Sequence, residues 1–308
     1  MYPEHIVYSE NLSIRAFACS VKHIPYHWHD AVEIIYVPVG SLEISLSDET
    51  HHLGKNMIAI ANAHEIHRMR QVGTEENRVF IVQIDRSWCE QVLPDFPFIF
   101  FWCCSTYQDL VESGDKYQQL QQYLHALLRT MAQPARDRCE ERILELVKKL
   151  LIYLSSDFDF IRLGLGPDEP REKQAARIKQ MYEYVVACDY QVSLSELAQE
   201  FNLSLYHMSH TFSERFGLNF QALLNYSKGE AAAKLLLGTD MRVTDISHEC
   251  GFSDPKYLAK YFNEHYQCTP TQFRKMYRVD LQKDPGAVLF EIYYLAECEA
   301  LLNEENGG

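Results

Sequence analysis

The sequence predicts an α+β multidomain protein with an N-terminal β-barrel, a helical hairpin and a C-terminal all-α bundle. Short strand-like runs fill the first hundred residues, and near Asp115 the apolar residues begin to repeat every three or four positions. Two helix-turn-helix patterns follow in the last part of the chain. With 308 residues, the chain is long enough for two or three domains.

These patterns divide the chain into five segments. They are residues 1–108 (barrel), 109–163 (helical hairpin), 164–171 (linker), 172–279 (helical bundle) and 280–308 (acidic C-terminal extension). The net charge of −14 as a whole argues against nucleic-acid binding. Its distribution does not, because residues 171–283 hold 14 Lys and Arg against 13 Asp and Glu, whereas residues 284–308 hold none against 6. Basic side chains can therefore still gather on one face of the helical bundle.

Strand-forming residues dominate the first segment. Four runs are rich in β-branched and aromatic side chains, and turn residues such as Gly and Asn separate them. The runs are Val32–Val39, Leu42–Leu46, Met57–Ile60 and Val79–Ile84. Short strands at this regular spacing are typical of an all-β sandwich or barrel.

Two apolar stripes at helical spacing follow the barrel. The first runs from Leu120 to Met131 and the second from Ile143 to Leu154, with Pro134 between them, which predicts a helical hairpin. The second stripe is wide enough to be a partner-binding seam, so the hairpin either pairs two protomers or packs on the barrel. In the first case the dimerisation residues are Ile143, Val147, Leu150 and Leu154.

The composition favours a cytoplasmic protein that does not bind a membrane. The longest strongly apolar run, Phe96–Cys104, is far shorter than the roughly 20 residues that span a bilayer. The N-terminus lacks the basic and apolar stretches of a signal peptide. The nine cysteines show no framework spacing, which is typical of reduced thiols.

The helical bundle contains the first helix-turn-helix pattern directly after the linker. Gly164–Pro170, with its glycines and prolines, cannot continue a helix, so the linker ends the hairpin. Ser193 and Glu196 then form a capping box, and a turn leads to a second helix over Leu205–Phe216.

The second pattern is more specific. A short helix over Val243–Glu249 is followed by a turn, and Asp254 caps the next helix with Pro255 at its first position. The stretch VTDISHECGFSDPKYLAKYFNEHYQCTPTQFR resembles very closely the C-terminal signature of the AraC/XylS family of transcription regulators. The resemblance covers Gln174 to Met276. It implies a DNA-binding domain in which two recognition helices, ~34 Å apart, enter successive major grooves on one face of the duplex.

The resemblance also implies which side chains contact DNA. Groove contacts would come from Tyr206, Ser209 and His210 on the first recognition helix, and from Pro255, Lys256, Ala259 and Lys260 on the second. Candidates for phosphate contact are Lys228, Lys234 and Arg274. The first helix departs from the family, because His210, Ser213 and Glu214 stand where relatives often carry Arg or Lys. We therefore expect the second helix to dominate binding, with Tyr257 packed inward beside Leu258, Tyr261 and Phe262.

The stretch HWHDAVE, at His27–Glu33, is a candidate binding site in the barrel. Side chains alternate in an extended strand, so His27, His29 and Glu33 would share the inward face. Imidazole and carboxylate groups on one face suit a transition metal, and they can equally hydrogen-bond the hydroxyl groups of an organic ligand.

The spacing of His27, His29, Glu33 and Gly40 is similar to the first motif of the cupin barrels, and the end of the second motif is similar to the stretch from Asn62 to His67. Asn62 and His64 replace the usual Pro and Gly. The resemblance implies a cupin-like barrel, which in AraC-like regulators commonly binds a sugar or another small effector without a metal. We therefore predict an effector pocket, with no metal and no cofactor. It is lined by His27, His29, Glu33 and His67. A metal-assisted pocket and a barrel without a ligand are the alternatives.

The acidic extension contains a segment, Ala287–Leu302, that is apolar enough to form a docked helix. It lies beyond the end of the family's DNA-binding domain. Either the helix covers an apolar patch, or its carboxylates lie near the basic face and moderate DNA binding.

Two functions are consistent with these patterns. The first is a DNA-binding transcription regulator, an activator on family grounds, that responds to a small molecule such as a sugar. The second is a metal-dependent cupin enzyme with an accessory helical domain. The duplicated helix-turn-helix favours the regulator, because an enzyme has no need of it. The partners expected are double-stranded DNA, a small-molecule effector, a second copy of the chain and RNA polymerase.

Overall fold

The computed structural model describes residues 4–8, 12–47, 49–94, 96, 99–101, 114–133, 140–157, 160–162, 184, 192–201, 204, 220–278 and 289–293. The chain divides into two compact units. The barrel unit comprises Pro3–Leu93, Phe101–Phe160 and Asp280–Gly308, and the helical unit comprises Met1–Tyr2, Pro94–Phe100 and Ile161–Val279. Among the described helices, none has the length and apolar character that crossing a membrane requires.

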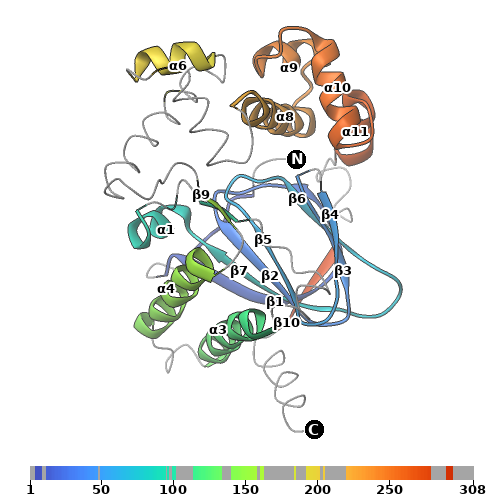
Figure 1. Ribbon diagram of the computed structural model, residues 1–308. Helices are drawn as coiled ribbons and strands as arrows, with labels where there is room; N and C mark the ends of the chain where they lie inside the picture. Colours follow the sequence, from blue (N-terminus) through green and yellow to red (C-terminus); the bar gives the residue numbers. More distant parts are fainter. Residues whose placement is uncertain are drawn as a thin grey trace. The chain divides into compact units, whose positions relative to one another are not determined.

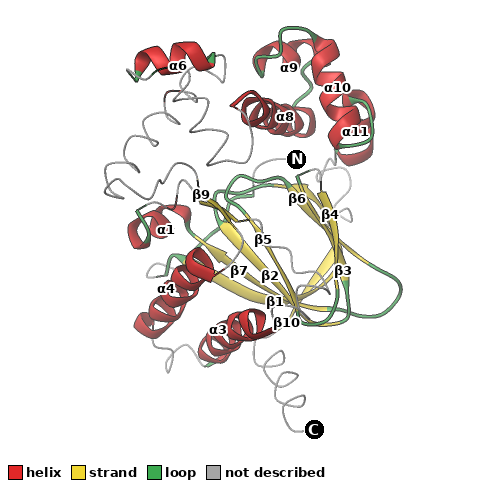
Figure 2. Cartoon of the chain, in the orientation of Figure 1, coloured by secondary structure: helices red, strands yellow, loops and turns green. Residues whose placement is uncertain are grey.

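An antiparallel β-barrel forms the body of the barrel unit (Figures 1 and 2). Its strands pair in the order β4-β3-β6-β1-β7-β2-β5. The bounds are Ile14–His27 (β1), Val32–Val39 (β2), Leu42–Leu46 (β3), Glu49–Leu53 (β4), Met57–Ala61 (β5), His67–Gln71 (β6) and Arg78–Ile84 (β7). Helix α1 (Arg86–Val92) follows β7. The four strands predicted from the sequence are observed to within one residue, and the barrel prediction is confirmed.

Strand β1 is the longest, with 14 residues. Its first half pairs with β7 from Ile14 to Cys19, and its second half pairs with β6 from His23 to His27. Between them, Asn77 continues the ladder with its side chain. Its Oδ1 accepts from the backbone N–H of Val21 at 2.8 Å, and its Nδ2 donates to the Val21 carbonyl at 2.9 Å. The buried amide thus joins β6 and β7 into one continuous partner for β1.

Of the barrel's turn residues with a left-handed backbone, two occupy positions of the cupin motifs, Gly40 and His64. Gly40 has φ 76°, and a Cβ there would lie 2.6 Å from the carbonyl oxygen of Glu76, so only glycine fits. His64 has φ 65° and occupies the position where the cupin motif usually has glycine. Its N–H donates to the carbonyl of His29 at 2.7 Å. This bond holds the β5–β6 turn against the β1–β2 turn.

A helical hairpin packs on the barrel through polar contacts. Its helices are α3 (Gly114–Ala132) and α4 (Glu140–Asp157). The hydroxyl of Tyr36 donates to Oδ1 of Asn56 at 3.0 Å and lies 3.0 Å from Nε2 of His125 on α3. Gln121 of α3 donates to the Asn56 carbonyl at 2.9 Å. Helix α3 is therefore anchored on β2 and on the turn before β5.

The apolar stripe of α4 packs inside the protomer and not at its surface. All four residues assigned to a dimer seam are 0–1% exposed in the single chain, and α4 packs against α3. They are Ile143, Val147, Leu150 and Leu154. The seam assignment for these side chains is corrected, because a side chain that is covered within its own chain cannot also pair two protomers. Of the large apolar side chains described on α4, Ile152 is the exposed one, at 43%.

The C-terminal extension contains a strand where the sequence predicted a helix. Residues Leu289–Tyr293 form β10, which pairs antiparallel with β1 from Ala18 to His23. The helix prediction is wrong over these five residues. Their composition of apolar, aromatic and β-branched side chains suits a strand as well as a helix stripe, and the open edge of β1 supplies the hydrogen bonds that decide between the two.

The helical unit contains the second helix-turn-helix pattern as predicted. Its helices are α6 (Leu194–Glu200), α8 (Phe220–Gly238), α9 (Val243–Glu249), α10 (Pro255–His265) and α11 (Pro270–Tyr277). The short strands β8 (Ile99–Phe101) and β9 (Phe160–Arg162) pair with each other and include the points where the chain passes from one unit to the other. Ser193 and Thr269 form capping boxes, and Asp254 caps α10 by accepting from the N–H of Lys256 at 2.8 Å. The predicted linker and the second helix of the first pattern lie outside the described residues.

Helices α8 and α10 are in tight contact at Gly229. A Cβ at Gly229 would lie 2.0 Å from Cε1 of Tyr261, which is far inside van der Waals contact. The Tyr261 ring is 6% exposed and stacks on His265, with 4.1 Å between the ring centroids. The missing side chain of Gly229 therefore makes the space that α10 fills.

Candidate functional site

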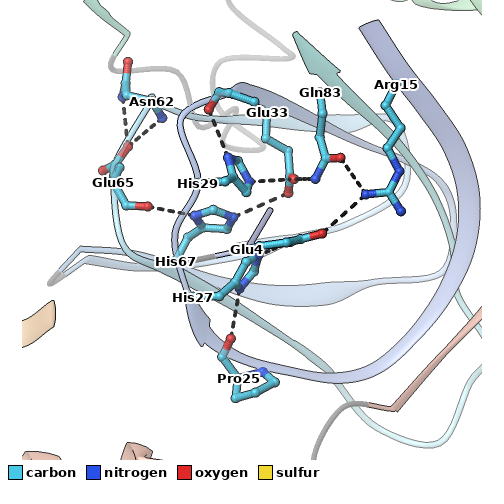
Figure 3. A network of polar contacts seen from close by, with 11 residues as sticks. Glu4, Arg15, Pro25, His27, His29, Glu33, Asn62, Glu65, His67 and Gln83 are labelled. Atoms are coloured by element: carbon cyan, nitrogen blue, oxygen red, sulfur yellow. Dashed lines mark hydrogen bonds and ion pairs between the residues drawn. The ribbon is translucent and has the colours of Figure 1, made fainter. Parts of the chain in front are cut away.

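The four residues predicted to line the pocket meet in the barrel, although they do not share one strand (Figure 3). His27 ends β1, His29 lies in the following turn, Glu33 is the second residue of β2, and His67 begins β6. All four are buried, with exposed fractions of 9%, 1%, 1% and 0%. We call them the histidine cluster. The single extended strand assumed from the sequence is wrong, because the chain turns at residues 28–31, but the turn brings the same side chains together.

The three imidazoles are all oriented by backbone carbonyls. Nδ1 of His27 lies 3.0 Å from the carbonyl of Pro25, Nδ1 of His29 lies 3.1 Å from that of Ala31, and Nδ1 of His67 lies 2.9 Å from that of Glu65. A carbonyl oxygen can only accept, so each Nδ1 carries the proton. Each Nε2 is then the atom that faces the centre of the cluster.

The Nε2 side of the cluster is rich in acceptors and poor in donors. The ligand atoms of the three histidines lie within 4.8 Å of one another. Among the described residues, Nε2 of His67 and Oε1 of Glu33 have no hydrogen-bond partner, and they lie 3.6 Å apart. Buried lone pairs without a donor are costly, so the cluster is incomplete without a cation or a donor group at its centre.

A chain of polar side chains holds Glu33. Its Oε2 lies 3.1 Å from Nε2 of His29 and accepts from Nε2 of Gln83 at 2.7 Å. Oε1 of Gln83 accepts from Arg15 at 3.1 Å, and Arg15 also donates to Glu4 at 3.3 Å. Gln83 interrupts the apolar run from Val79 to Ile84, which is the signal by which the sequence could have identified it.

Burial and neighbouring charges set the protonation of the cluster. Burial, followed by the nearby His67, lowers the pKa of His27 from 6.5 to about 3, so His27 is neutral. Burial alone would lower the pKa of His29, but the contact with Glu33 outweighs it and raises the pKa. Both ring nitrogens of His29 face acceptors, which requires an imidazolium. Burial would raise the pKa of Glu33, but His29 and His67 hold it well below its usual range.

The donor set fits a transition metal. Three imidazole nitrogens and one carboxylate oxygen suit zinc, iron, nickel, cobalt or manganese, whereas magnesium and calcium prefer oxygen ligands alone. Metal-binding histidines usually donate their other ring N–H to a carbonyl or a carboxylate, as all three do here. A metal cation would take the place of the proton on Nε2 of His29 and satisfy the lone pairs of the other two rings.

The position of His67 is fixed by the residues that depart from the cupin pattern. Asn62 exchanges two hydrogen bonds with the backbone of Phe101, at 2.8 and 3.0 Å, and donates through Nδ2 to the Glu65 carboxylate at 2.9 Å. The carbonyl of Glu65 orients His67. Asn62, through these contacts, and His64, through its hydrogen bond to the His29 carbonyl, therefore hold the turn that places His67 in the cluster.

The exposed face of α10 is a candidate DNA interface. Leu258, Tyr261 and Phe262 point into the helical unit, as predicted. Lys256 and Lys260 are exposed, with only loose ion pairs to Asp254 at 3.5 Å and Glu264 at 3.7 Å. The other two predicted groove residues, Pro255 and Ala259, are partly exposed.

The prediction that Tyr257 packs inward is wrong. Its side chain is 49% exposed, and Nζ of Lys256 lies 5.0 Å from the centre of its ring. The buried residues Leu258, Tyr261 and Phe262 are spaced at i, i+3 and i+4, which places Tyr257 on the neighbouring, exposed stripe. Tyr257 thus joins the two lysines on the candidate interface.

The residues predicted to contact phosphate have partners within the helical unit. Lys228 donates to the carbonyl of Gly251 at 2.9 Å, in the turn before α10. Arg274 donates to the carbonyls of Leu236 and Met241, at 3.1 and 2.7 Å. Nζ of Lys234 lies 3.7 Å from Oε2 of Glu230. These contacts give Lys228 and Arg274 a structural role, and phosphate contact stays a prediction. The first-helix residues Tyr206, Ser209 and His210 lie outside the described residues.

Two family models match this chain. A helix-turn-helix domain matches residues 197–276, and an AraC-like ligand-binding domain matches residues 13–151. The chain belongs to the AraC family of transcription regulators.

Curated relatives of this AraC-family protein match about a third of its length. The uncharacterised regulator YijO of Escherichia coli K12 is 33% identical over 89 residues, 29% of this chain and 31% of its own. The regulatory protein PocR of Salmonella typhimurium LT2 is 30% identical over 113 residues, 36% of this chain and 35% of its own. The chain thus spans about a third of the length of these two curated relatives.

Solved structures are similar to this AraC-family chain as well. The C-terminal domain of the response regulator yesN from Fusobacterium nucleatum has 32% identity and a TM-score of 0.30, and covers 33% of this chain and 98% of its own. ToxT from Vibrio cholerae O395 has 11% identity and a TM-score of 0.45, and covers 86% of this chain and 98% of its own.

Proposed function

We propose that the chain regulates transcription by binding double-stranded DNA through its helix-turn-helix segments, under the control of a ligand bound at the histidine cluster. The observation that carries the DNA-binding part is the pattern α9, turn, α10 within a matched helix-turn-helix domain, with two exposed lysines, Lys256 and Lys260, on the outer face of α10. A fluorescent duplex with the DNA upstream of the chain's own gene tests it. Absence of binding at low salt, with and without metal, would contradict the proposal.

The two lysines of α10 give a direct test of the interface. Lys256→Ala and Lys260→Ala should each weaken DNA binding, by about 1–3 kcal/mol where the lysine contacts a base, which is roughly ten- to a hundredfold. Fluorescence anisotropy at moderate salt measures the dissociation constants. The control is Lys149→Ala, an exposed lysine on α4 paired with Glu145, which should leave DNA affinity unchanged. Wild-type affinity in both α10 variants would place the interface on another face.

The ligand of the barrel is the second part of the proposal. The sequence favoured a metal-free pocket for an organic effector. The convergence of three oriented Nε2 atoms and a carboxylate, with few donors among them, supports a divalent transition metal instead. Such an ion would be held by His27, His29, His67 and Glu33, and it would supply a positive charge and open coordination positions for an effector. Gln83 and Arg15 would orient the Glu33 carboxylate.

Metal content tests this assignment independently of DNA binding. Protein purified without chelator should carry near-stoichiometric zinc, iron, nickel, cobalt or manganese by elemental analysis. His67→Ala should lose most of it, because one ligand is removed, whereas His52→Ala, which replaces an exposed imidazole on β4, should retain it. Zinc added to metal-stripped wild type should raise its melting temperature, because the ion binds the folded state alone. A wild type that binds none of these ions would return the proposal to the metal-free effector pocket.

The finer expectations stay predictions. They are a sugar as the effector, transcription activation, a homodimer, contact with RNA polymerase and a cytoplasmic location.

A further inference from the structure

Strand β10 lies on the edge of β1 that the rest of the barrel leaves open. Ala18 and Cys19 of β1 each pair with β7 and also with β10, through Tyr293 and Ile292. A strand has two edges, so β10 covers the edge opposite β7. It pairs with β1 over Ala18 to His23, and this pairing is main-chain hydrogen bonding of the kind used in strand addition.

One side chain of β10 anchors it on the barrel. The Tyr293 hydroxyl donates to Oε1 of Glu76 at 3.0 Å, and the guanidinium carbon of Arg78 lies 4.1 Å from the centre of the Tyr293 ring. Arg78 and Glu76 form an ion pair at 2.7 Å. Since β1 lies between β10 and β7, the Tyr293 side chain crosses β1 to reach Arg78.

The other described side chains of β10 contribute little burial. Phe290 is 39% exposed and Ile292 is 57% exposed. The strand is thus held by a short ladder and one aromatic anchor, and not by a large apolar face. An element with few buried contacts can detach locally without unfolding the barrel.

Because of its position in the sequence, β10 links the last helix of the helical unit to β1 of the barrel. It follows α11, the last helix of the helical unit, after only the eleven residues 278–288. Fully extended, eleven residues span about 40 Å. The segment Ile161–Val279 of the helical unit is therefore joined to the barrel unit at both of its ends when β10 is paired, and at its N-terminal end alone when β10 is free. Residues 289–293 lie outside both matched family models, so this second connection is an addition to the matched domains.

We propose that β10 is a detachable strap that restrains the helical unit and lowers its affinity for DNA. While β10 is paired with β1, the second connection limits the positions that the recognition helices can take. Release of β10 removes that limit and makes the DNA-bound position easier to reach. The inference concerns the connection between the units, and it stands whether or not the histidine cluster binds a metal.

Strand β1 also gives the strap a link to the cluster. His23 pairs with Leu289 of β10, and His27, four residues further along the same strand, belongs to the cluster. The register of the pairing between β1 and β10 shifts between Val21 and His23. The register of the pairing between β1 and β6 shifts between Ile24 and His27. A change in the position of His27 can therefore alter the pairing of β10 through a continuous piece of backbone.

Cutting the connection without removing the strand tests the strap. A recognition site for a specific protease, inserted within residues 280–286 of the full chain, allows DNA affinity to be measured before and after cleavage of one preparation. The side chains stay the same and cleavage adds one carboxylate and one ammonium group, with no change in net charge, so the main change is the loss of the covalent restraint. Cleavage should raise DNA affinity about five- to tenfold, the lower end of usual coupling between two sites.

Variants of the anchor complete the test. Tyr293→Ala removes the contacts with Glu76 and Arg78, so it should raise DNA affinity before cleavage, and cleavage should then add little. Tyr293→Phe retains the ring over Arg78 and should behave more like wild type. The melting temperature of the barrel unit shows whether each variant is folded. Unchanged or lower DNA affinity after cleavage would overturn the proposal.

Discussion

Replacing Val147 and Leu150 together with glutamate is expected to unfold the barrel unit and not to separate two protomers. Both side chains are buried in the hairpin of a single chain, at 0% and 1% exposure. Each new carboxylate would lose its hydration among apolar neighbours without gaining a partner. The loss, on the order of several kcal/mol per charge, is comparable with a total domain stability of about 5–15 kcal/mol.

Circular dichroism during thermal unfolding, together with sedimentation, measures the outcome. The control is Ile152→Glu on the same helix, where the side chain is 43% exposed and a carboxylate stays hydrated. This variant should melt near the wild type. A double variant that stays folded but becomes monomeric would restore the seam that the sequence suggested.

Gly229→Ala is expected to destabilise the helical unit, although alanine is the better helix former. The new methyl group would lie 2.0 Å from Cε1 and 2.1 Å from Cζ of Tyr261, so α8 and α10 must move apart. Such overpacking typically costs about 1–3 kcal/mol, and the severity of this contact outweighs the roughly 1 kcal/mol that alanine gains in helix propensity. Urea unfolding measures the net loss.

A double-mutant cycle isolates the contact. Tyr261→Ala should itself destabilise the unit, since it opens a cavity. In that background Gly229→Ala should no longer destabilise, because the ring that it would strike is absent. Asn225→Ala, at an exposed position of α8, serves as the control. A Gly229→Ala protein as stable as wild type would show that α10 accommodates the methyl group by a small shift.

Local patterns predicted the barrel strands and the second helix-turn-helix well. Val32–Val39 and Val243–Glu249 are observed with the predicted bounds, because apolar alternation and caps are encoded within a few residues. The same local information could not place β10. Its five residues suit a strand or a helix, and the choice depends on the edge of β1, some 270 residues earlier in the chain.

The candidate site was predictable in its members but not in its chemistry. Residue types and spacing identified His27, His29, Glu33 and His67. The carbonyls that fix each Nδ1 belong to Pro25, Ala31 and Glu65, whose roles depend on backbone turns that the sequence does not display. The prediction that Tyr257 is buried was wrong for a related reason. Tyr257, Leu258, Tyr261 and Phe262 are all apolar or aromatic, so their spacing on a short helix does not show where the buried face ends.

The pairing of β10 has a practical consequence for protein solubility. A chain shortened after α11, as the ends of both matched domains would suggest, would leave the β1 edge from Ala18 to His23 with unpaired N–H and C=O groups. An open edge of that kind is a template for strand pairing between molecules. The present edge is safer, because β10 has only five residues and carries the exposed charge of Glu291. We therefore expect the shortened chain to aggregate at concentrations where the full chain stays in solution, which light scattering would detect.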